Sequence, residues 1–135
     1  MISAEGSMVV QFYDLDPMQV VWHGNYARFL EVGRGALLDF IGYNYAEMAR
    51  SGYMWPIVDM RLKYVRPARL GQNLRVVAKL REYENRLRID YRISDAASGE
   101  TLTKAETTQV AVLAQSGELC LECPAALTDR VRALL

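Results

Sequence analysis

The stretch YDLDPMQVVWHGNYARFLEVGRGALLDFIG, which runs from Tyr13 to Gly42, decides the fold of this 135-residue chain. From Tyr26 onward its apolar residues recur every three or four positions, and the charged residues fall away from that stripe. This spacing predicts a long helix with one buried face. We expect Asn25 to cap the helix and Gly42 to end it. The predicted buried positions are Tyr26, Phe29, Leu30, Gly33, Leu37, Phe40 and Ile41.

Three small residues, Gly33, Gly35 and Ala36, lie inside the predicted helix. A glycine in the middle of a helix costs roughly 0.5–1 kcal/mol relative to alanine, so its presence needs a reason. We expect another backbone to approach the helix closely at these positions. A curved sheet wrapped around the helix would provide that approach.

The rest of the chain is typical of an antiparallel sheet. Apolar and charged residues alternate with a period of two, which predicts strands with one covered face and one polar face. Turn residues at 84–85 and 97–100 predict hairpins. The sequence therefore predicts one α+β domain over residues 1–135, with a long helix on a sheet of five or six strands. The predicted strands are 8–13, 58–64, 74–81, 87–93 and 102–114, with a return at 119–123, and short helices are predicted at 45–50 and after Pro124.

Composition excludes several classes of protein. Lysine plus arginine total 16 and aspartate plus glutamate total 16, so no net field attracts nucleic acid or an anionic membrane. No apolar run approaches the roughly 20 residues that span a bilayer. Residues 1–7 lack the features of a signal peptide. We therefore expect a cytoplasmic protein with reduced cysteines. Cys120 and Cys123 alone do not supply the four ligands of a structural zinc site, so no metal centre is predicted.

The loop before the helix holds the residues best suited to chemistry. Asp16 precedes Pro17, and the only histidine, His23, follows seven residues after that carboxylate. Each has a plainer structural interpretation, because Asp16 can start a turn and a histidine can serve structure alone. We expect Asp14 to be a structural hydrogen-bond acceptor. We expect Glu31, which lies off the apolar stripe, to be solvated or at an interface.

The run D-x-D-P-x-x-V-V-W-H-G-N-Y, followed by an amphipathic helix and a sheet, resembles the hot-dog-fold acyl-CoA thioesterases of the 4-hydroxybenzoyl-CoA thioesterase (4HBT) and YbgC-like type. The resemblance implies the hot-dog fold, in which a curved antiparallel sheet wraps a central helix. It also implies that Asp16 is the catalytic carboxylate and that the backbone N–H at His23 polarises the thioester carbonyl. The chain departs from the YbgC-like pattern at Met18-Gln19, where glycine is usual, and at Phe12, where a tyrosine is usual.

The residues support the same chemistry. Thioester hydrolysis needs a general base or nucleophile, a role open to Asp16, and donors for the developing oxyanion, which a helix N-terminus supplies. The function predicted is thus an acyl-CoA thioesterase, a hydrolase, with Asp16 and His23 as catalytic residues. No Ser/His/Asp triad is readable. The alternatives are a hot-dog enoyl-thioester hydratase or dehydratase, and a non-catalytic module that binds acyl thioesters.

Substrate and partner predictions follow from the resemblance. The substrate is an acyl-CoA or an acyl-carrier-protein thioester, and coenzyme A is part of that substrate, so no cofactor is expected. Gly24, Asn25 and Tyr26 are candidate binding residues at the helix start, and Arg66 and Arg69 are candidates for the phosphates. Family members form homodimers that commonly assemble into homotetramers. The aromatic segment 51–56 is a candidate for the acyl tunnel or an interface.

Overall fold

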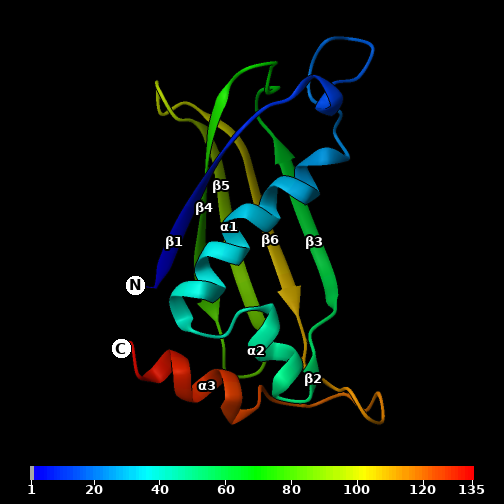
Figure 1. Ribbon diagram of the computed structural model, residues 1–135, viewed down its shortest axis with the longest axis vertical. Helices are drawn as coiled ribbons and strands as arrows, with labels where there is room; N and C mark the ends of the chain where they lie inside the picture. Colours follow the sequence, from blue (N-terminus) through cyan, green and yellow to red (C-terminus); the bar gives the residue numbers. More distant parts are fainter. Residues whose placement is uncertain (1) are drawn as a thin grey trace.

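The computed structural model describes residues 2–135. The long helix α1 (Asn25–Ile41) lies on one face of a five-stranded antiparallel sheet with strand order β1-β4-β5-β6-β3 (Figure 1). This arrangement confirms the predicted α+β architecture. The five strands are β1 (Ser3–Val9), β3 (Ile57–Tyr64), β4 (Asn73–Glu82), β5 (Leu87–Asp95) and β6 (Thr101–Gln109).

Smaller elements close the two ends of this sheet. A 3₁₀ turn, η1 (Phe12–Asp14), follows β1, and a separate two-stranded sheet pairs β2 (Tyr53–Met54) with β7 (Val112–Leu113). The short helices α2 (Tyr45–Arg50) and α3 (Ala125–Arg132) confirm the two predicted short helices. Within residues 2–135, no helix is both long and apolar enough to cross a membrane.

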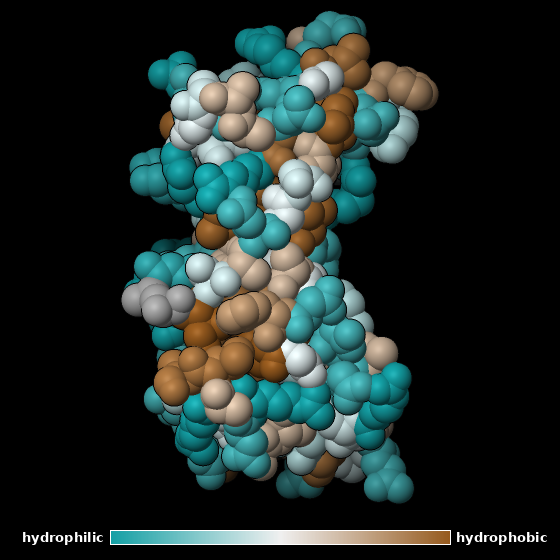
Figure 2. Space-filling model, turned by 60° about the vertical axis from the view of Figure 1, so that its left-hand side comes forward, coloured by the Kyte–Doolittle hydropathy of each residue, from teal (hydrophilic) through white to brown (hydrophobic). Residues whose placement is uncertain are grey.

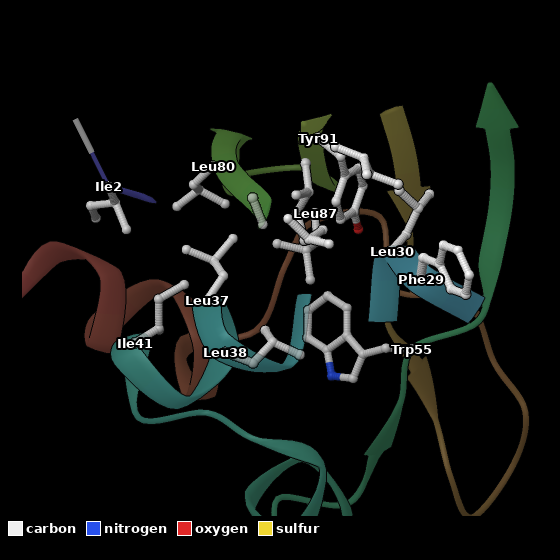
Figure 3. Packing of buried hydrophobic residues seen from close by; sticks show 14 of the residues in the cluster. Ile2, Phe29, Leu30, Leu37, Leu38, Ile41, Trp55, Leu80, Leu87 and Tyr91 are labelled. Carbon is white, nitrogen blue, oxygen red and sulfur yellow. The ribbon is translucent and has the colours of Figure 1, made fainter. Parts of the chain in front are cut away.

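The core lies between α1 and the sheet. Phe29, Leu30, Leu37 and Leu38 of α1 are fully buried, and Figure 3 shows Leu37 and Leu38 on the side of the helix that faces the strands. Burial of apolar surface is worth about 25 cal/mol per Å², so this face dominates the stability of the fold. The sheet residues that complete the core include Leu74, Val76, Leu80, Leu87, Ile89, Tyr91 and Ile93.

The buried stripe of α1 differs from the prediction at three positions. Phe40 is 55% exposed, whereas Arg34 and Leu38 are only 4% and 0% exposed. The buried set continues through Leu37, Leu38 and Ile41, and this path leaves Phe40 to one side. Gly42 ends the helix as predicted, with a positive φ of 84°.

The glycine prediction is right at one position and wrong at another. A Cβ at Gly33 would lie 2.8 Å from Val76 Cγ1, which shows that β4 approaches the helix backbone closely. A Cβ on Gly35 would meet nothing within 4 Å. Only Gly33 therefore owes its lack of a side chain to the sheet.

The first strand lies earlier than predicted. β1 spans Ser3–Val9, and its inward-facing positions include Ala4 and Gly6. These small residues carry little hydrophobic signal, yet a Cβ on Gly6 would lie 2.6 Å from Val32 Cγ1 of α1. The predicted strand 8–13 is wrong because the chain leaves the sheet after Val9 and enters η1.

The predicted strand 102–114 is also wrong in its length. β6 ends at Gln109, and the chain then crosses into the small sheet, where β7 pairs with β2. The predicted return at 119–123 is reduced to one bridge between Leu119 and Val112. The hairpin turns at 84–85 and 97–100 are confirmed by the β4–β5 and β5–β6 pairings.

Two strands form the edges of the sheet. Among residues 2–135, β1 pairs only with β4 and β3 only with β6, but α1 lies over β1, β4 and β5 rather than over β3 (Figure 1). Val58 and Tyr64 on this strand are 58% and 48% exposed, although the alternation predicted a covered face. Figure 2 shows further apolar surface on the other side of the molecule, where β1, the end of α1 and α3 lie.

Candidate active site

The loop between η1 and α1 is a miniature hairpin that begins at Asp16. Leu15 and Val21 form a bridge, and the Asp16 N–H donates to the Val20 carbonyl at 2.8 Å. The Gln19 N–H donates to the Asp16 carbonyl at 3.0 Å, with Gln19 at a φ of 68°. The structural interpretation of Asp16 as a turn residue is thus correct. The tight turn also fixes its carboxylate in place.

The Asp16 carboxylate is half-buried and partly free. One oxygen, Oδ1, accepts the Met18 N–H at 2.8 Å. The other, Oδ2, has no hydrogen bond to any of the residues 2–135. Asp16 lines a cavity of about 240 Å³ together with His23, Tyr26 and Tyr64. The loop carboxylate and the start of α1 therefore face one space.

Backbone donors lie at the start of α1, where His23 lines that cavity. The Trp22 carbonyl accepts the Asn25 N–H at 2.9 Å. Over the part of the chain that the structure describes, the N–H groups of His23 and Gly24 meet no protein acceptor. Free N–H groups at a helix N-terminus, at the positive end of the helix dipole, favour negative charge.

The cap of this helix differs from the prediction. Gly24 is the N-cap, no side chain caps the helix, and Asn25 is its first residue. Asn25 instead donates from Nδ2 to the Asp14 carbonyl at 2.8 Å, so it ties the helix to the loop. Gly24 has a steric reason to be glycine, because a Cβ there would lie 2.3 Å from the Trp22 ring.

Asp14 holds the loop against the helix. Its side chain is 1% exposed, forms an ion pair with Arg28, and accepts the Gln11 N–H at 2.9 Å. Its carbonyl accepts the Trp22 N–H at 3.0 Å. The predicted role as a structural acceptor is confirmed, and Asp14 lies in η1.

Two tyrosines form the far wall of the cavity. The Tyr26 and Tyr64 rings lie edge to face, 5.1 Å between centroids. The Tyr26 hydroxyl accepts the Ala68 N–H at 2.9 Å, and burial, followed by the neighbouring charges of Tyr64 and Asp16, raises the pKa of this phenol. The Tyr64 hydroxyl donates to the His23 carbonyl at 2.9 Å. Sequence reasoning missed Tyr64, and its only signal was its position just before Arg66-Pro67.

The other residues that were predicted for the site do not all lie at the Asp16 cavity. The His23 side chain is exposed, with its ring 5.2 Å from that of Trp22. Arg66 lines the Asp16 cavity and pairs with Glu100 at 3.5 Å. Arg69 lines an adjoining hollow of about 200 Å³ that also contains Arg66. The structure thus brings Asp16, His23, Tyr26 and Arg66 together and leaves Arg69 beside them.

A second cavity, of about 400 Å³, lies at the opposite end of β3. Tyr53, Met54 and Trp55 line it, with Gln109 of β6. These residues belong to the aromatic segment that was predicted to line a tunnel or an interface. In α1, Glu31 pairs with Arg34 and accepts the Tyr45 hydroxyl at 2.8 Å, so it is held by neighbours rather than simply solvated.

Two remaining features lie outside the Asp16 cavity. A hollow of about 690 Å³ between β3, β5 and β6 is lined mostly by charged residues such as Lys63, Arg92 and Lys104. Cys120 and Cys123 are free thiols. Among residues 2–135, no three His, Cys, Asp or Glu side chains lie close enough together to hold a metal ion.

Comparisons with known proteins agree with this fold. The model of the Thioesterase-like superfamily matches residues 10–131. The Bacillus subtilis protein named "Putative acyl-CoA thioesterase YneP" is 32% identical over 104 residues, 76% of this chain and 75% of its own. The 1,4-dihydroxy-2-naphthoyl-CoA thioesterase of Synechocystis superposes with a TM-score of 0.86 at 20% identity, over 98% of this chain and 97% of its own. The DHNA-CoA thioesterase of Staphylococcus aureus superposes with a TM-score of 0.83 at 24% identity, over 90% and 81%.

Proposed function

Because the chain belongs to the thioesterase-like superfamily and is a thioester hydrolase with the hot-dog fold, we propose that it hydrolyses acyl-CoA to a free acid and coenzyme A at the Asp16 cavity. The observation that carries this proposal is the shared cavity. A half-buried carboxylate and His23, whose N–H has no acceptor among residues 2–135, line the same space of about 240 Å³, and the free Gly24 N–H is on the next residue. Hydrolysis needs both groups on one carbonyl.

The reaction has two routes that use the same groups. As a general base, Asp16 takes a proton from water, and the resulting hydroxide adds to the thioester carbonyl carbon. As a nucleophile, Asp16 adds directly, and water then hydrolyses the anhydride. In both routes the N–H groups at His23 and Gly24 stabilise the oxyanion, the C–S bond breaks, and the thiolate leaves and takes up a proton. The His23 ring is assigned no proton transfer.

Arginine side chains at the cavity mouth suit the nucleotide part of the substrate. Arg66 lines the Asp16 cavity, and Arg69 lines the adjoining hollow. Guanidinium groups bind phosphate oxygens in a bidentate manner. The helix-start residues Gly24, Asn25 and Tyr26 shape the site rather than contact the phosphates: Asn25 and Tyr26 already bond the Asp14 carbonyl and the Ala68 N–H.

We also propose that the chain works as a homodimer joined through β3. This strand has one unpaired edge and exposed apolar residues, and an open edge favours pairing with another strand. Antiparallel pairing of β3 with its copy would bring the second copy's cavity at Tyr53, Met54 and Trp55, the aromatic cavity, toward Asp16 of the first copy. The acyl group would bind in this aromatic cavity. Light scattering tests this: the parent should be a dimer or a tetramer built from two dimers, and Val58→Lys should yield monomers. A monomeric parent would exclude the dimer.

A cytoplasmic location remains part of the proposal. The two free cysteines support a reducing compartment. Cell fractionation tests it.

The activity is tested by incubating the parent with short, long and aromatic acyl-CoAs and measuring both free thiol and free acid. Equal amounts of the two products are expected from at least one substrate. Loss of an enoyl-CoA absorbance without thiol release would instead indicate a hydratase. Binding without any turnover, on CoA and on carrier-protein thioesters alike, would contradict the proposal and indicate a binding module.

A further inference from the structure

One hydrogen bond at the start of α1 joins two segments that are 41 residues apart in sequence: the Tyr64 hydroxyl donates to the His23 carbonyl at 2.9 Å. That carbonyl belongs to the peptide unit that also carries the Gly24 N–H. In a trans peptide the C=O and N–H groups point in opposite directions, and no cis peptide occurs among the described residues. Holding the carbonyl therefore fixes the direction of the Gly24 N–H.

The preceding peptide unit is held in the same way. The Trp22 carbonyl accepts the Asn25 N–H at 2.9 Å, which fixes the peptide that carries the His23 N–H. Within residues 2–135 neither N–H has an acceptor. Two consecutive peptide units thus have tied carbonyls and free donors. Donors that are fixed before the substrate binds need no reorganisation during the reaction, which is the main source of oxyanion stabilisation.

The peptide unit between His23 and Gly24 is held by the Tyr64 side chain, and neighbouring residues hold that side chain in turn. The Tyr64 ring packs edge to face on Tyr26 at 5.1 Å, and the Tyr26 hydroxyl accepts the Ala68 N–H at 2.9 Å. Without the phenol, the His23 carbonyl would lose this partner, and the peptide unit that carries the Gly24 N–H would be free to rotate. A donor that rotates away from the thioester oxygen stabilises the developing oxyanion less well.

We propose that Tyr64 is a positioning residue for thioester hydrolysis: it binds the His23 carbonyl and thereby keeps the helix start in the orientation that stabilises the transition state. The inference rests on the proposed function and extends it. In this role Tyr64 transfers no proton. Its effect belongs to the transition state, because the charge on the thioester oxygen is greatest there.

The test is Tyr64→Phe, which removes the hydroxyl and keeps the ring that packs on Tyr26. The matched control is Tyr13→Phe, the same chemical change on a side chain that is 66% exposed. We expect kcat of Tyr64→Phe to fall roughly 5- to 50-fold, less than the ~100-fold or larger loss when an oxyanion donor itself is removed. KM should stay within about twofold, and the pH–rate profile should keep its shape. The control should match the parent in all three.

A second measurement does not depend on activity. In ¹H–¹⁵N NMR spectra the Gly24 amide signal should shift in Tyr64→Phe and stay in place in Tyr13→Phe, because only the former loses the donor to the His23 carbonyl. An unmoved Gly24 signal would overturn the orientation inference. A shifted signal with unchanged kcat would overturn the catalytic role. A parent without thiol release would instead overturn the proposed function, and the NMR result would still decide whether Tyr64 orients this peptide.

Discussion

Two aspartates that are two residues apart serve different purposes at this site. Asp14 is 1% exposed, and its carboxylate forms an ion pair with Arg28 and accepts the Gln11 N–H. Asp16 is half-buried, and no other described residue binds its Oδ2. A buried carboxylate must be paired to persist, whereas a reactive one must keep an oxygen available. The Asp14–Arg28 pair therefore supports the geometry from which Asp16 acts.

The first residue-scale prediction concerns Arg28. Arg28→Met would leave the buried Asp14 carboxylate without its cation, although Arg28 itself is 56% exposed and thus partly screened. We expect a loss of about 1–2 kcal/mol in the free energy of unfolding, measured with urea. Arg81→Met, which breaks an exposed pair with Asp90, is the control and should cost less than about 1 kcal/mol. Equal losses in the two variants would show that Asp14 does not depend on Arg28.

At the scale of elements, two glycines on α1 should respond to alanine in opposite directions. Gly33→Ala places a Cβ 2.8 Å from Val76 Cγ1 and 3.3 Å from the Val76 carbonyl, so β4 must shift. We expect a loss of about 1–3 kcal/mol. Gly35→Ala meets nothing within 4 Å, and it should stabilise the helix by about 0.5–1 kcal/mol. Thermal unfolding of the two variants checks the signs, and a destabilised Gly35→Ala would mean that another chain packs there.

The elements also show what the sequence could and could not predict. β4 and β5 were predictable because their buried and exposed residues alternate without interruption. β1 was misplaced because its inward face includes Ala4 and Gly6, which carry little hydrophobic signal. The burial of Arg34 was not predictable from a periodicity that treats charge as exposed. Its partner Glu31 lies one turn earlier on the same helix, but the other partner of Arg34, Tyr45, belongs to α2, and that contact exists only after the two helices pack.

The site likewise has residues that the sequence could predict and residues that it could not. The positions of Asp16 and His23 follow from a local motif, because a short loop and a helix start place both. Tyr64 arrives from β3, 41 residues along the chain from His23. Such a contact is set by tertiary packing and leaves no trace in local spacing. Asn25 was assigned the wrong role because the Asp14 carbonyl, its true partner, is brought back only by the hairpin loop.

At the scale of the whole molecule, buried acidic groups make the fold sensitive to alkaline pH. Burial, with a smaller contribution from Glu82, raises the pKa of Cys123 from 9.0 to about 12. Burial also raises the pKa of Tyr26 and Tyr91. A raised folded-state pKa means that the unfolded chain releases its proton first. This contribution to stability is therefore complete below pH 9 and is lost as the pH rises toward 12.

We accordingly expect the free energy of unfolding to decrease steadily between pH 9 and pH 11. Cys123→Ala should show a shallower decrease than the parent, because one of the contributing groups is gone. Urea unfolding at several pH values gives the slopes, and the comparison uses slopes because the substitution also leaves a small cavity. Identical slopes in the two proteins would show that Cys123 does not contribute.

The arrangement of the helix and strands determines the location of the site. The loop after β1, the start of α1 and the end of β3 meet at one end of the sheet (Figure 1). The sheet and the core hold these three segments, and each supplies one part of the site: the carboxylate, the donors and the phenol. The aromatic cavity lies at the other end of β3, and a second copy paired along this strand would connect the two.

The most direct test of the central role of Asp16 is thiol release from acyl-CoA by Asp16→Asn, compared with the parent and with Asp129→Asn. Asp129 is an exposed aspartate on α3 and serves as the matched control. Asparagine keeps the acceptor oxygen that binds the Met18 N–H but cannot act as base or carboxylate nucleophile. We expect Asp16→Asn to lose at least about 100-fold in kcat while its folding and substrate binding persist, and Asp129→Asn to match the parent. Undiminished thiol release by a folded Asp16→Asn protein would contradict the central role of this carboxylate.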